Sequence, residues 1–248
     1  MLDQVDFELE AGVVGSQVDA HGARGCHTEP VAGVDGVRNQ WLVAKVHAGQ
    51  VAWTVAENAA TVLRATGDCA AVGVDVPMGL PDTGYRSCDL AARERLGRDR
   101  SSVFHAPIRR VLRDVDSHPA ASAASRAAHG KGISIQVWHL LPKIEQWDDL
   151  PVPEHVVEVH PEVSFRAMAL ATVFAGKKTA RGAVQRLRAV SAWLPVAPLL
   201  AGLPADAPLD DALDALACAW SATRYARQRA ETLGGERDAH GRPMRIVV

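Results

Sequence analysis

The sequence lacks the features of membrane, exported and disulfide-stabilised proteins. No apolar run approaches the roughly 20 residues that a membrane-spanning helix requires. The first residues are acidic and lack the basic and then apolar layout of a signal peptide. The 4 cysteines are scattered without a CxxC pair, which argues against a structural zinc site and against a disulfide framework. We therefore expect a cytoplasmic protein with free thiols and no membrane partner.

The charge is nearly balanced over the whole chain but uneven along it. Of the 248 residues, 48% are apolar and 23% are charged, which is ordinary for a globular protein. The formal net charge of −2 implies no polyanionic partner by itself. Eight arginines stand against three acids between residues 86 and 113, and residues 177–188 hold five basic side chains and no acid. The arginine-rich stretch either tracks a phosphate backbone or forms a solvated helix face.

The pattern of apolar residues predicts three consecutive strands, a helix and a fourth strand. We expect residues 1–30 to form a poorly ordered leader, because they are rich in glycine and charge and show little periodicity. A helical crossover before the fourth strand lets that strand pair in parallel with the first. The expected ranges are 31–37, 41–46 and 51–56 for the strands, 57–66 for the helix and 70–76 for the fourth strand.

The second half of the chain is predicted to be mainly helical. Residues 79–150 show no clear sheet element, so we expect a helical insertion at about 80–150 within a single domain of residues 31–248. The later elements are a fifth strand at 156–160, helices at 162–174, 178–193 and 209–233, and an edge strand in the tail at 244–248.

Two aspartates close buried strands and a third lies inside the last long helix. A buried carboxylate costs several kcal/mol unless a cation or hydrogen bonds offset it. Asp35 and Asp75 end the first and fourth strands, which would be neighbours about 4.8 Å apart. Asp211 and Asp214 share one face of the last helix. Asp210 is explained as a helix cap, but Asp214 lies a full turn inside the helix. These acids therefore suggest a site for a divalent metal.

Four motifs recur in this order in one family. They are GVDG at 33–36, DVPMGL at 75–80, EVHPE at 158–162 and DDALDA at 210–215. With them, the chain from about residue 31 to residue 225 resembles a widespread prokaryotic family described as predicted nucleases of the RNase H fold, a domain of unknown function.

The resemblance implies a fold, a cofactor and a reaction. The fold is α/β, with an RNase H-like mixed five-stranded sheet in the order 3-2-1-4-5, flanked by helices. The superfamily places acids on the first strand, the fourth strand and a late helix, where they bind Mg²⁺ or Mn²⁺. That implies metal ligation by Asp35, Asp75 and Asp214, with Asp211 beside them as a further catalytic acid. The implied reaction is two-metal hydrolysis of a phosphodiester, with nucleic acid as the partner.

Further site residues follow from charge and position. Glu158 is a candidate fourth ligand or general base, although a structural role is as good an explanation. His160 is interpreted as a structural histidine. Candidate substrate-binding residues are the cations of the basic stretches and of the insertion: Arg86, Arg93, Arg109, Lys131, Lys143 and Lys177.

Two other functions remain open at this point. A phosphotransferase of the actin and sugar-kinase type also begins with a strand that carries Asp-Gly. Such proteins need two related lobes and a second glycine-rich phosphate loop, for which this chain is too short, and Gly234 and Gly235 follow no expected strand. A catalytically silent module that binds nucleic acid or nucleotide is the third hypothesis, since function belongs to sites and not to folds.

Overall fold

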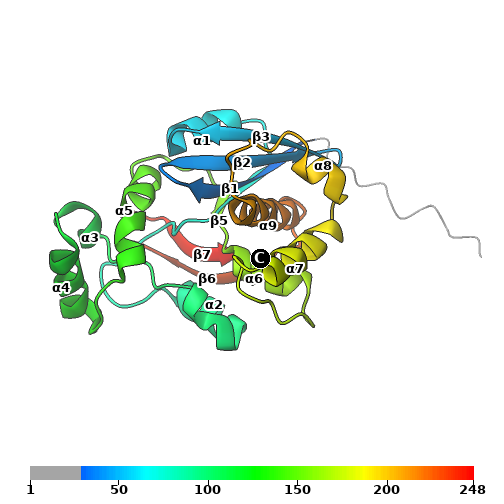
Figure 1. Cartoon of the computed structure of the whole chain (residues 1–248). Helices are drawn as coiled ribbons and strands as arrows, with labels where there is room; N and C mark the ends of the chain where they lie inside the picture. The colour runs from blue at the N-terminus through cyan, green and yellow to red at the C-terminus, as the bar shows by residue number, and fades with distance from the viewer. Residues whose placement is uncertain (1–28) are drawn as a thin grey trace, which may run out of the picture.

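The computed structural model describes residues 29–248, so residues 1–28 of the predicted leader lie outside the described part. The described chain is built around a five-stranded mixed sheet in the order β3-β2-β1-β4-β5 (Figure 1). This confirms the predicted α/β fold and strand order, and the strand boundaries differ from the predicted ones by at most two residues. The strands are β1 (Val31–Val37), β2 (Gln40–His47), β3 (Gln50–Ala56), β4 (Ala71–Val74) and β5 (Val156–Glu158).

The crossover from β3 to β4 sets the parallel pairing at the centre of the sheet. Helix α1 (Ala59–Ala65) begins after Asn58, whose side chain accepts a hydrogen bond from the backbone N–H of Thr61. The chain then returns so that β4 pairs in parallel with β1, with Val34 opposite Val74. The residue that follows each of these two valines along the chain is an aspartate, Asp35 in β1 and Asp75 just after β4. The predicted juxtaposition of the first and fourth strand ends is therefore present.

Helices cover both faces of the sheet. Helix α9 (Leu209–Ala226) packs on one face, where its apolar side chains join those of β1 and β2. Helices α6 (Pro161–Met168), α7 (Ala180–Ser191) and α8 (Val196–Leu200) lie on the same side as α9. The opposite face is covered by α1 and by α5 (Ile135–Asp148), which share a core with Val34 and Val74.

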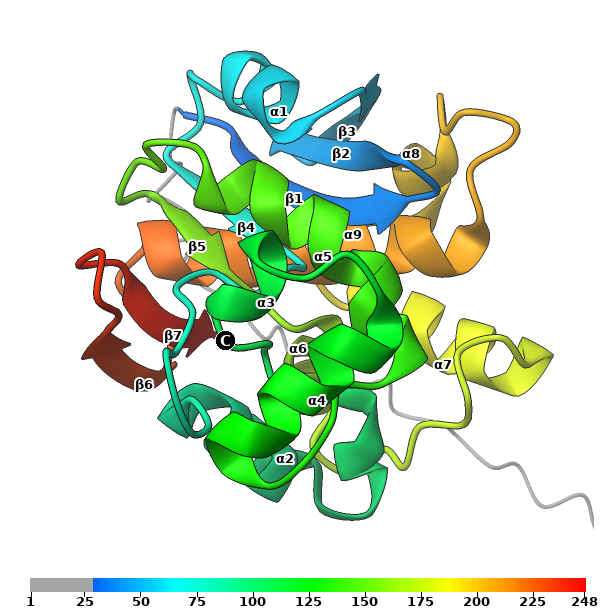
Figure 2. The ribbon, with the colours of Figure 1, turned by 90° about the vertical axis from the view of Figure 1, so that its left-hand side faces the viewer.

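The predicted helical insertion is present between β4 and β5, and it contributes to the core. It comprises α2 (Ser87–Leu96), the 3-10 helix η1 (Gly97–Ser102), α3 (Arg110–Arg113), α4 (His118–His129) and then α5. Figure 2 shows α2, α3 and α4 gathered at one end of the sheet, while α5 runs beside its central strands. Because α5 packs on the sheet, the insertion is an integral layer and not a detached cap.

The C-terminal part differs from the expectation. Helix α9 ends at Ala226 and not near residue 233, because β6 (Thr232–Arg237) pairs there with β7 (Pro243–Val247). The tail is a strand as predicted, but it belongs to this separate two-stranded sheet and not to the edge of the large one. Helix α6 likewise ends at Met168. Within the described residues, no helix has both the length and the apolar character needed to cross a membrane.

Candidate carboxylate site

Gly33 and Gly73 let α9 pack closer to the sheet than it could if either position carried a side chain. A Cβ atom on Gly33 would lie 1.9 Å from the carbonyl oxygen of Ala215, and one on Gly73 would lie 2.5 Å from the carbonyl oxygen of Cys218. Real Cβ atoms do not approach backbone atoms this closely. Since both glycines face α9, the residues two positions further along their strands face it as well. Those residues are Asp35 and Asp75.

The three acids that the sequence singled out are brought together at this contact. Asp214 lies on α9, next to Ala215, and is only 2% exposed, while Asp35 is 7% exposed. The carboxyl groups of Asp35 and Asp75 are within hydrogen-bonding reach of each other. The backbone N–H of Gly36 donates to Asp35 Oδ1 at 2.8 Å. The site therefore lies where β1, the end of β4 and α9 meet, with Asp35 and Asp214 buried and Asp75 half-buried.

Burial and mutual repulsion both oppose ionisation of these acids. Burial raises the pKa of Asp35 well above its ordinary value, and the charges of the neighbouring acids raise it further. Burial, followed by the charge of Asp214, raises the pKa of Asp75 from 3.8 to about 8. The pKa of Asp214 is raised to about 6, because burial outweighs the opposing effect of Lys177. The cluster therefore needs more positive charge than the protein supplies.

Lys177 is the cation nearest to the three acids. Its Nζ donates to Asp214 Oδ2 at 2.5 Å, and its side chain is partly exposed. Burial lowers the pKa of Lys177, but the Asp214 carboxylate more than offsets this and raises it. The second oxygen, Asp214 Oδ1, is buried and has no hydrogen-bond partner among the described residues. An orphaned buried carboxylate oxygen is costly, so this atom is available to a ligand.

The chemistry of the site fits a hard divalent cation. Carboxylate oxygens are the donors that Mg²⁺ and Mn²⁺ prefer, and a cation would offset the repulsion that raises the three pKa values. The orphaned Oδ1 of Asp214 supplies a donor without a competing bond. Among the described residues, however, no group of three or more histidine, cysteine, aspartate or glutamate side chains has a geometry ready to hold a metal. Side-chain adjustment, including at Lys177, would accompany binding.

The rim of the site contains Lys143 and Asp211. Lys143 on α5 donates to the backbone carbonyl of Gln40 at 2.6 Å and lies 4.5 Å from the centre of the Trp41 ring. Burial lowers the pKa of Lys143, and the charges of Asp35 and Asp211 oppose that shift. Lys143 therefore lies beside the acids. Asp211 is half-buried at the start of α9.

A shallow pocket of about 460 Å³ adjoins the acids between the first turns of α7 and α9. Lys177 and Asp211, which flank Asp214, are on its wall. Lys178 adds a further positive charge there. The exposed opening beside the buried acids is therefore lined by both signs of charge.

Glu158 does not share this site, contrary to the prediction that it is a fourth ligand or general base. Gly73 is paired with Val157, and both face α9, so Glu158 points to the opposite face of the sheet. There it accepts two bonds from the Arg86 guanidinium, both at 2.7 Å. Its Oε2 also accepts the backbone N–H of Met78 at 2.7 Å. We therefore assign Glu158 a structural role.

Two predicted substrate-binding arginines are structural for the same reason. Arg86 is 1% exposed and pairs with Asp89 at 2.5 Å as well as with Glu158, so it has no donor left for a substrate. Arg109 is buried and pairs with Asp148 at 2.6 Å and with Asp238. Local charge counting cannot detect such pairs, because most of the partners lie far away in the sequence. Only the Arg86–Asp89 ion pair could have been predicted from the sequence, because the two residues are three positions apart.

The remaining predicted cations are not part of the carboxylate cluster. Arg93 donates to the backbone carbonyls of Arg100 and Val103, which ties α2 to the following 3-10 helix. Lys131 is exposed in the loop before α5. His160 shares a contact with the carbonyl oxygen of Ser102 at 3.3 Å, in line with a structural histidine. Of the six predicted cations, Lys143 and Lys177 are thus the two that lie beside the acids.

Comparisons with known proteins give a family and no activity. A family model described as "Protein of unknown function (DUF429)" matches residues 33–239. Neither the curated proteins nor the solved structures gave a match. The matched range contains Asp35, Asp75 and Asp214. The chain therefore belongs to the DUF429 family of proteins of unknown function.

Proposed function

We propose that this protein is a phosphodiester hydrolase, and specifically a nuclease, that uses Mg²⁺ or Mn²⁺ held by Asp35, Asp75 and Asp214. One observation carries the proposal. Three acids from distant segments meet at one place: Asp35 and Asp214 are buried and Asp75 is half-buried. Among the described residues, Asp214 Oδ1 has no hydrogen-bond partner. A folded protein rarely retains such a cluster without a ligand that offsets its cost, because buried charges are normally paired.

The charges at the site support binding of a divalent metal ion, because the protein's own cations do not neutralise all three acids. Asp35, Asp75 and Asp214 would carry three negative charges when ionised. Lys177 directly neutralises one carboxylate oxygen, and Lys143 lies at the rim with its Nζ on a backbone carbonyl. The pKa of Asp75 remains raised to about 8 despite Lys177. A divalent cation would supply the missing charge.

The residues of this chain have distinct roles in such a reaction. A divalent cation held there would lower the pKa of the attacking water and offset charge at the reacting phosphate. Asp35 and Asp75, on rigid strand ends, and Asp214, on α9, would fix the ligand oxygens. Lys177 is placed to move from Asp214 to a phosphate oxygen, since its side chain is partly exposed and lines the shallow pocket. Water adds to phosphorus, the phosphorus–oxygen bond to the leaving group breaks, and a proton passes to the leaving oxygen.

Nucleic acid is the substrate class that this arrangement suits best. The shallow pocket adjoins Lys177 and Lys178 at the start of the basic stretch 177–188. Arg86 and Arg109 of the other basic stretch are buried and form ion pairs within the protein. That stretch therefore contributes less to binding a phosphate backbone than the sequence indicated. We therefore expect phosphate contacts to centre on the α7 side of the site.

The proposal is tested by metal binding and cleavage together. Wild-type protein and the variants Asp35→Asn, Asp75→Asn and Asp214→Asn are titrated with Mn²⁺ by calorimetry. They are then assayed on single-stranded RNA, single-stranded DNA, an RNA–DNA hybrid and a branched DNA. We expect wild-type cleavage that depends on Mn²⁺ or Mg²⁺, and a loss on the order of 100-fold in each variant.

A matched control is available at the surface. Asp68 pairs with Lys45 at 2.5 Å, and its side chain is 63% exposed, so Asp68→Asn changes the same group away from the site. It should leave metal binding and cleavage unchanged. Undiminished cleavage in the Asp75→Asn variant would remove the acids from the mechanism. Tight nucleic-acid binding without turnover would favour the silent module, and stabilisation by ATP alone would favour a phosphotransferase.

A further inference from the structure

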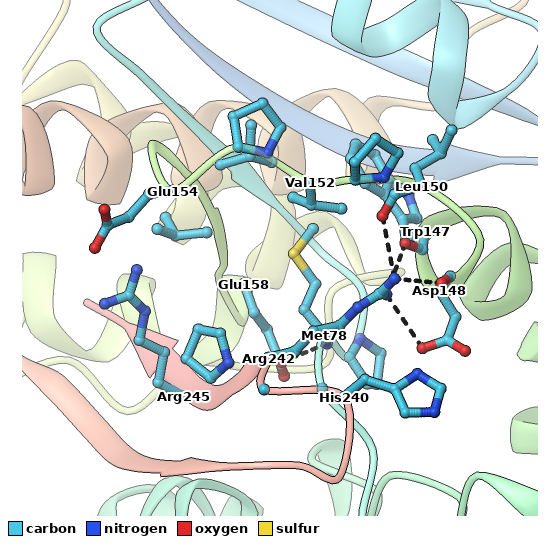
Figure 3. A pocket seen from close by; sticks show the side chains of 18 of the residues that line it. Met78, Trp147, Asp148, Leu150, Val152, Glu154, Glu158, His240, Arg242 and Arg245 are labelled. Carbon is cyan, nitrogen blue, oxygen red and sulfur yellow. Dashed lines mark hydrogen bonds and ion pairs between the residues drawn. The ribbon is translucent and has the colours of Figure 1, made fainter.

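A second cavity lies beside β5, the edge strand of the large sheet. Its volume is about 420 Å³, and none of Asp35, Asp75 and Asp214 lines it. Its walls come from four segments: the turn after β4, the end of α5 with the loop that follows, strand β5 and the β6–β7 hairpin (Figure 3). Cavities of this size accommodate small organic ligands, typically between apolar walls with a few placed polar groups.

One part of the cavity wall is apolar. Met78 and Val152 lie in the middle of the view in Figure 3, with prolines around them. Proline and valine walls are stiff, because their side chains have few rotamers. Such a surface favours a flat ring system over a flexible polar chain. The apolar residues on the wall include Pro77, Met78, Pro151, Val152, Pro153 and Val156.

Most of the charge around the cavity is already paired within the protein. Asp148 accepts from Arg109 at 2.6 Å and from Arg242 at 3.2 Å. The Arg242 guanidinium also donates hydrogen bonds to the backbone carbonyls of Trp147, Asp148 and Leu150. Glu158 is held by Arg86, as described above. These contacts fix the walls and leave no charge of Asp148, Glu158 or Arg242 for a ligand.

The lining charges that remain give an excess of one positive charge. They are Arg237 and Arg245 on the hairpin against Glu154 on the loop. Arg245 Nη2 donates to the Tyr225 hydroxyl at 3.1 Å, and its guanidinium lies 5.4 Å from the centre of that ring. Its other nitrogens have no protein partner among the described residues. Arg245 and Glu154 both lie at the same end of the cavity in Figure 3, although no ion pair joins them in the described structure.

We propose that this cavity binds a small organic anion that has a flat apolar ring system, with the rings against Met78 and Val152 and the anionic group at Arg245. The tyrosine contact holds the guanidinium in place before a ligand arrives, which lowers the entropy cost of binding. The free nitrogens of Arg245 can then donate charge-assisted hydrogen bonds to a phosphate, sulfonate or carboxylate. The site is independent of the metal ligands, because it uses none of them.

A pair of fluorescent dyes tests both parts of the proposal. Anilinonaphthalene sulfonate and its uncharged analogue phenylnaphthylamine have the same ring system and differ in the sulfonate group. Both are titrated into the full chain in EDTA, so that the outcome does not depend on metal binding or catalysis. We expect saturable binding of both dyes at one site per chain, with the sulfonate dye about tenfold tighter.

Two variants and one control decide the outcome. Val152→Trp fills the cavity and should abolish saturable binding of both dyes. Arg245→Met keeps the aliphatic stem beside Tyr225 and should remove the preference for the sulfonate dye while leaving the uncharged dye unaffected. Val184→Trp adds the same indole on α7, where the native valine is 47% exposed and outside the cavity, and should change neither titration.

Three results would overturn the proposal. They are the absence of saturable dye binding to wild-type protein, dye binding that Val152→Trp leaves unchanged, and a sulfonate preference that survives Arg245→Met. Because Val152→Trp could also unfold the protein, thermal melting is measured in parallel. If that variant is unfolded, the dye preference of the Arg245→Met variant decides alone.

Discussion

Lys177 donates to one oxygen of Asp214, and the other oxygen has no partner within residues 29–248. A lysine in a carboxylate cluster can have two roles: it can neutralise the acids, and it can contact the substrate phosphate. If Lys177 only neutralised the acids, its removal would leave the cluster more negative and would not weaken metal binding. If it also contacts the substrate phosphate, its removal must slow cleavage. The two effects can be measured separately.

We predict that Lys177→Met lowers kcat/KM for the best nucleic-acid substrate on the order of 100-fold while Mn²⁺ binds at least as tightly as to wild-type protein. The loss arises because the cation paired with Asp214 is no longer there to donate to the phosphate. Cleavage kinetics and calorimetric Mn²⁺ titration check the two parts. Lys45→Met, which removes a cation paired with Asp68 away from the site, is the control. A parallel loss of metal affinity in Lys177→Met would contradict the assignment.

The metal-free protein should become less stable as the pH rises. The pKa of Asp75 is about 8 in the folded protein, against an ordinary value of 3.8. The folded state therefore keeps a proton that the unfolded state has lost. The resulting stabilisation is fully present below about pH 4 and is lost as the pH rises towards 8, with a slope of at most about 1.4 kcal/mol per pH unit.

Asp75→Asn should weaken this dependence, because the amide does not ionise, although burial still raises the pKa values of Asp35 and Asp214. In EDTA we expect the variant to exceed wild-type protein in unfolding free energy at pH 8, and the difference to shrink at pH 5. Urea denaturation at several pH values measures it. Added Mn²⁺ should stabilise wild-type protein and not the variant. A difference that stays constant across this pH range would show that Asp75 ionises normally.

Gly33→Ala should disturb both stability and the site. Its Cβ would lie 1.9 Å from the Ala215 carbonyl oxygen and 2.2 Å from the Ala219 nitrogen, so α9 must shift away from β1. Forcing extra bulk into a packed contact typically costs about 1–3 kcal/mol. We expect a cost of that size, together with weaker Mn²⁺ binding because Asp214 moves with α9.

Gly67→Ala provides the comparison for that substitution. A Cβ on Gly67 would meet nothing nearer than the Leu63 carbonyl oxygen at 3.5 Å, which is ordinary contact. This variant should remain within about 0.5 kcal/mol of wild-type stability. Urea denaturation and Mn²⁺ calorimetry cover both variants. Equal stability of the two would show that the helix–sheet contact is looser than the structure indicates.

Arg86→Met tests whether this arginine is structural. Its removal leaves Glu158 and Asp89 buried without their cation, and breaking a buried ion pair in this way costs about 3–5 kcal/mol. The exposed pair of Arg38 with Asp206, at 3.0 Å, is the control, and Arg38→Met should cost less than about 1 kcal/mol. If Arg86→Met were as stable as Arg38→Met and lost only substrate affinity, the original substrate-binding interpretation would be restored.

The central geometry of the site followed from the sequence for a definite reason. Asp35 lies near the end of β1 and Asp75 directly follows β4, and the helical crossover between those strands makes them parallel neighbours. The register of the two strands then fixes where the two carboxyl groups lie relative to each other. Asp214 followed from its position inside an apolar helix, where a capping role does not apply.

The roles of Glu158 and Arg86 could not be predicted in the same way. Alternation along a strand shows which residues share a face, but it does not show which face packs on α9. That choice depends on the pairing of Gly73 with Val157, a tertiary contact. Arg86 looked like an exposed cation because its partner Glu158 comes from a segment 72 positions away. The C-terminal hairpin was missed because Gly234 and Gly235 weaken the strand pattern of β6.

The order of the segments has a consequence for biosynthesis. β1 and β4 leave the ribosome early, whereas α9 is the last long helix in the described chain. Until α9 emerges, Gly33 and Gly73 have no helix to pack against, and Asp35 and Asp75 have neither Asp214 beside them nor an enclosed environment. A nascent chain that has not yet released α9 therefore carries an incomplete ligand set. Any chemistry of this cluster is therefore delayed until α9 has been synthesised.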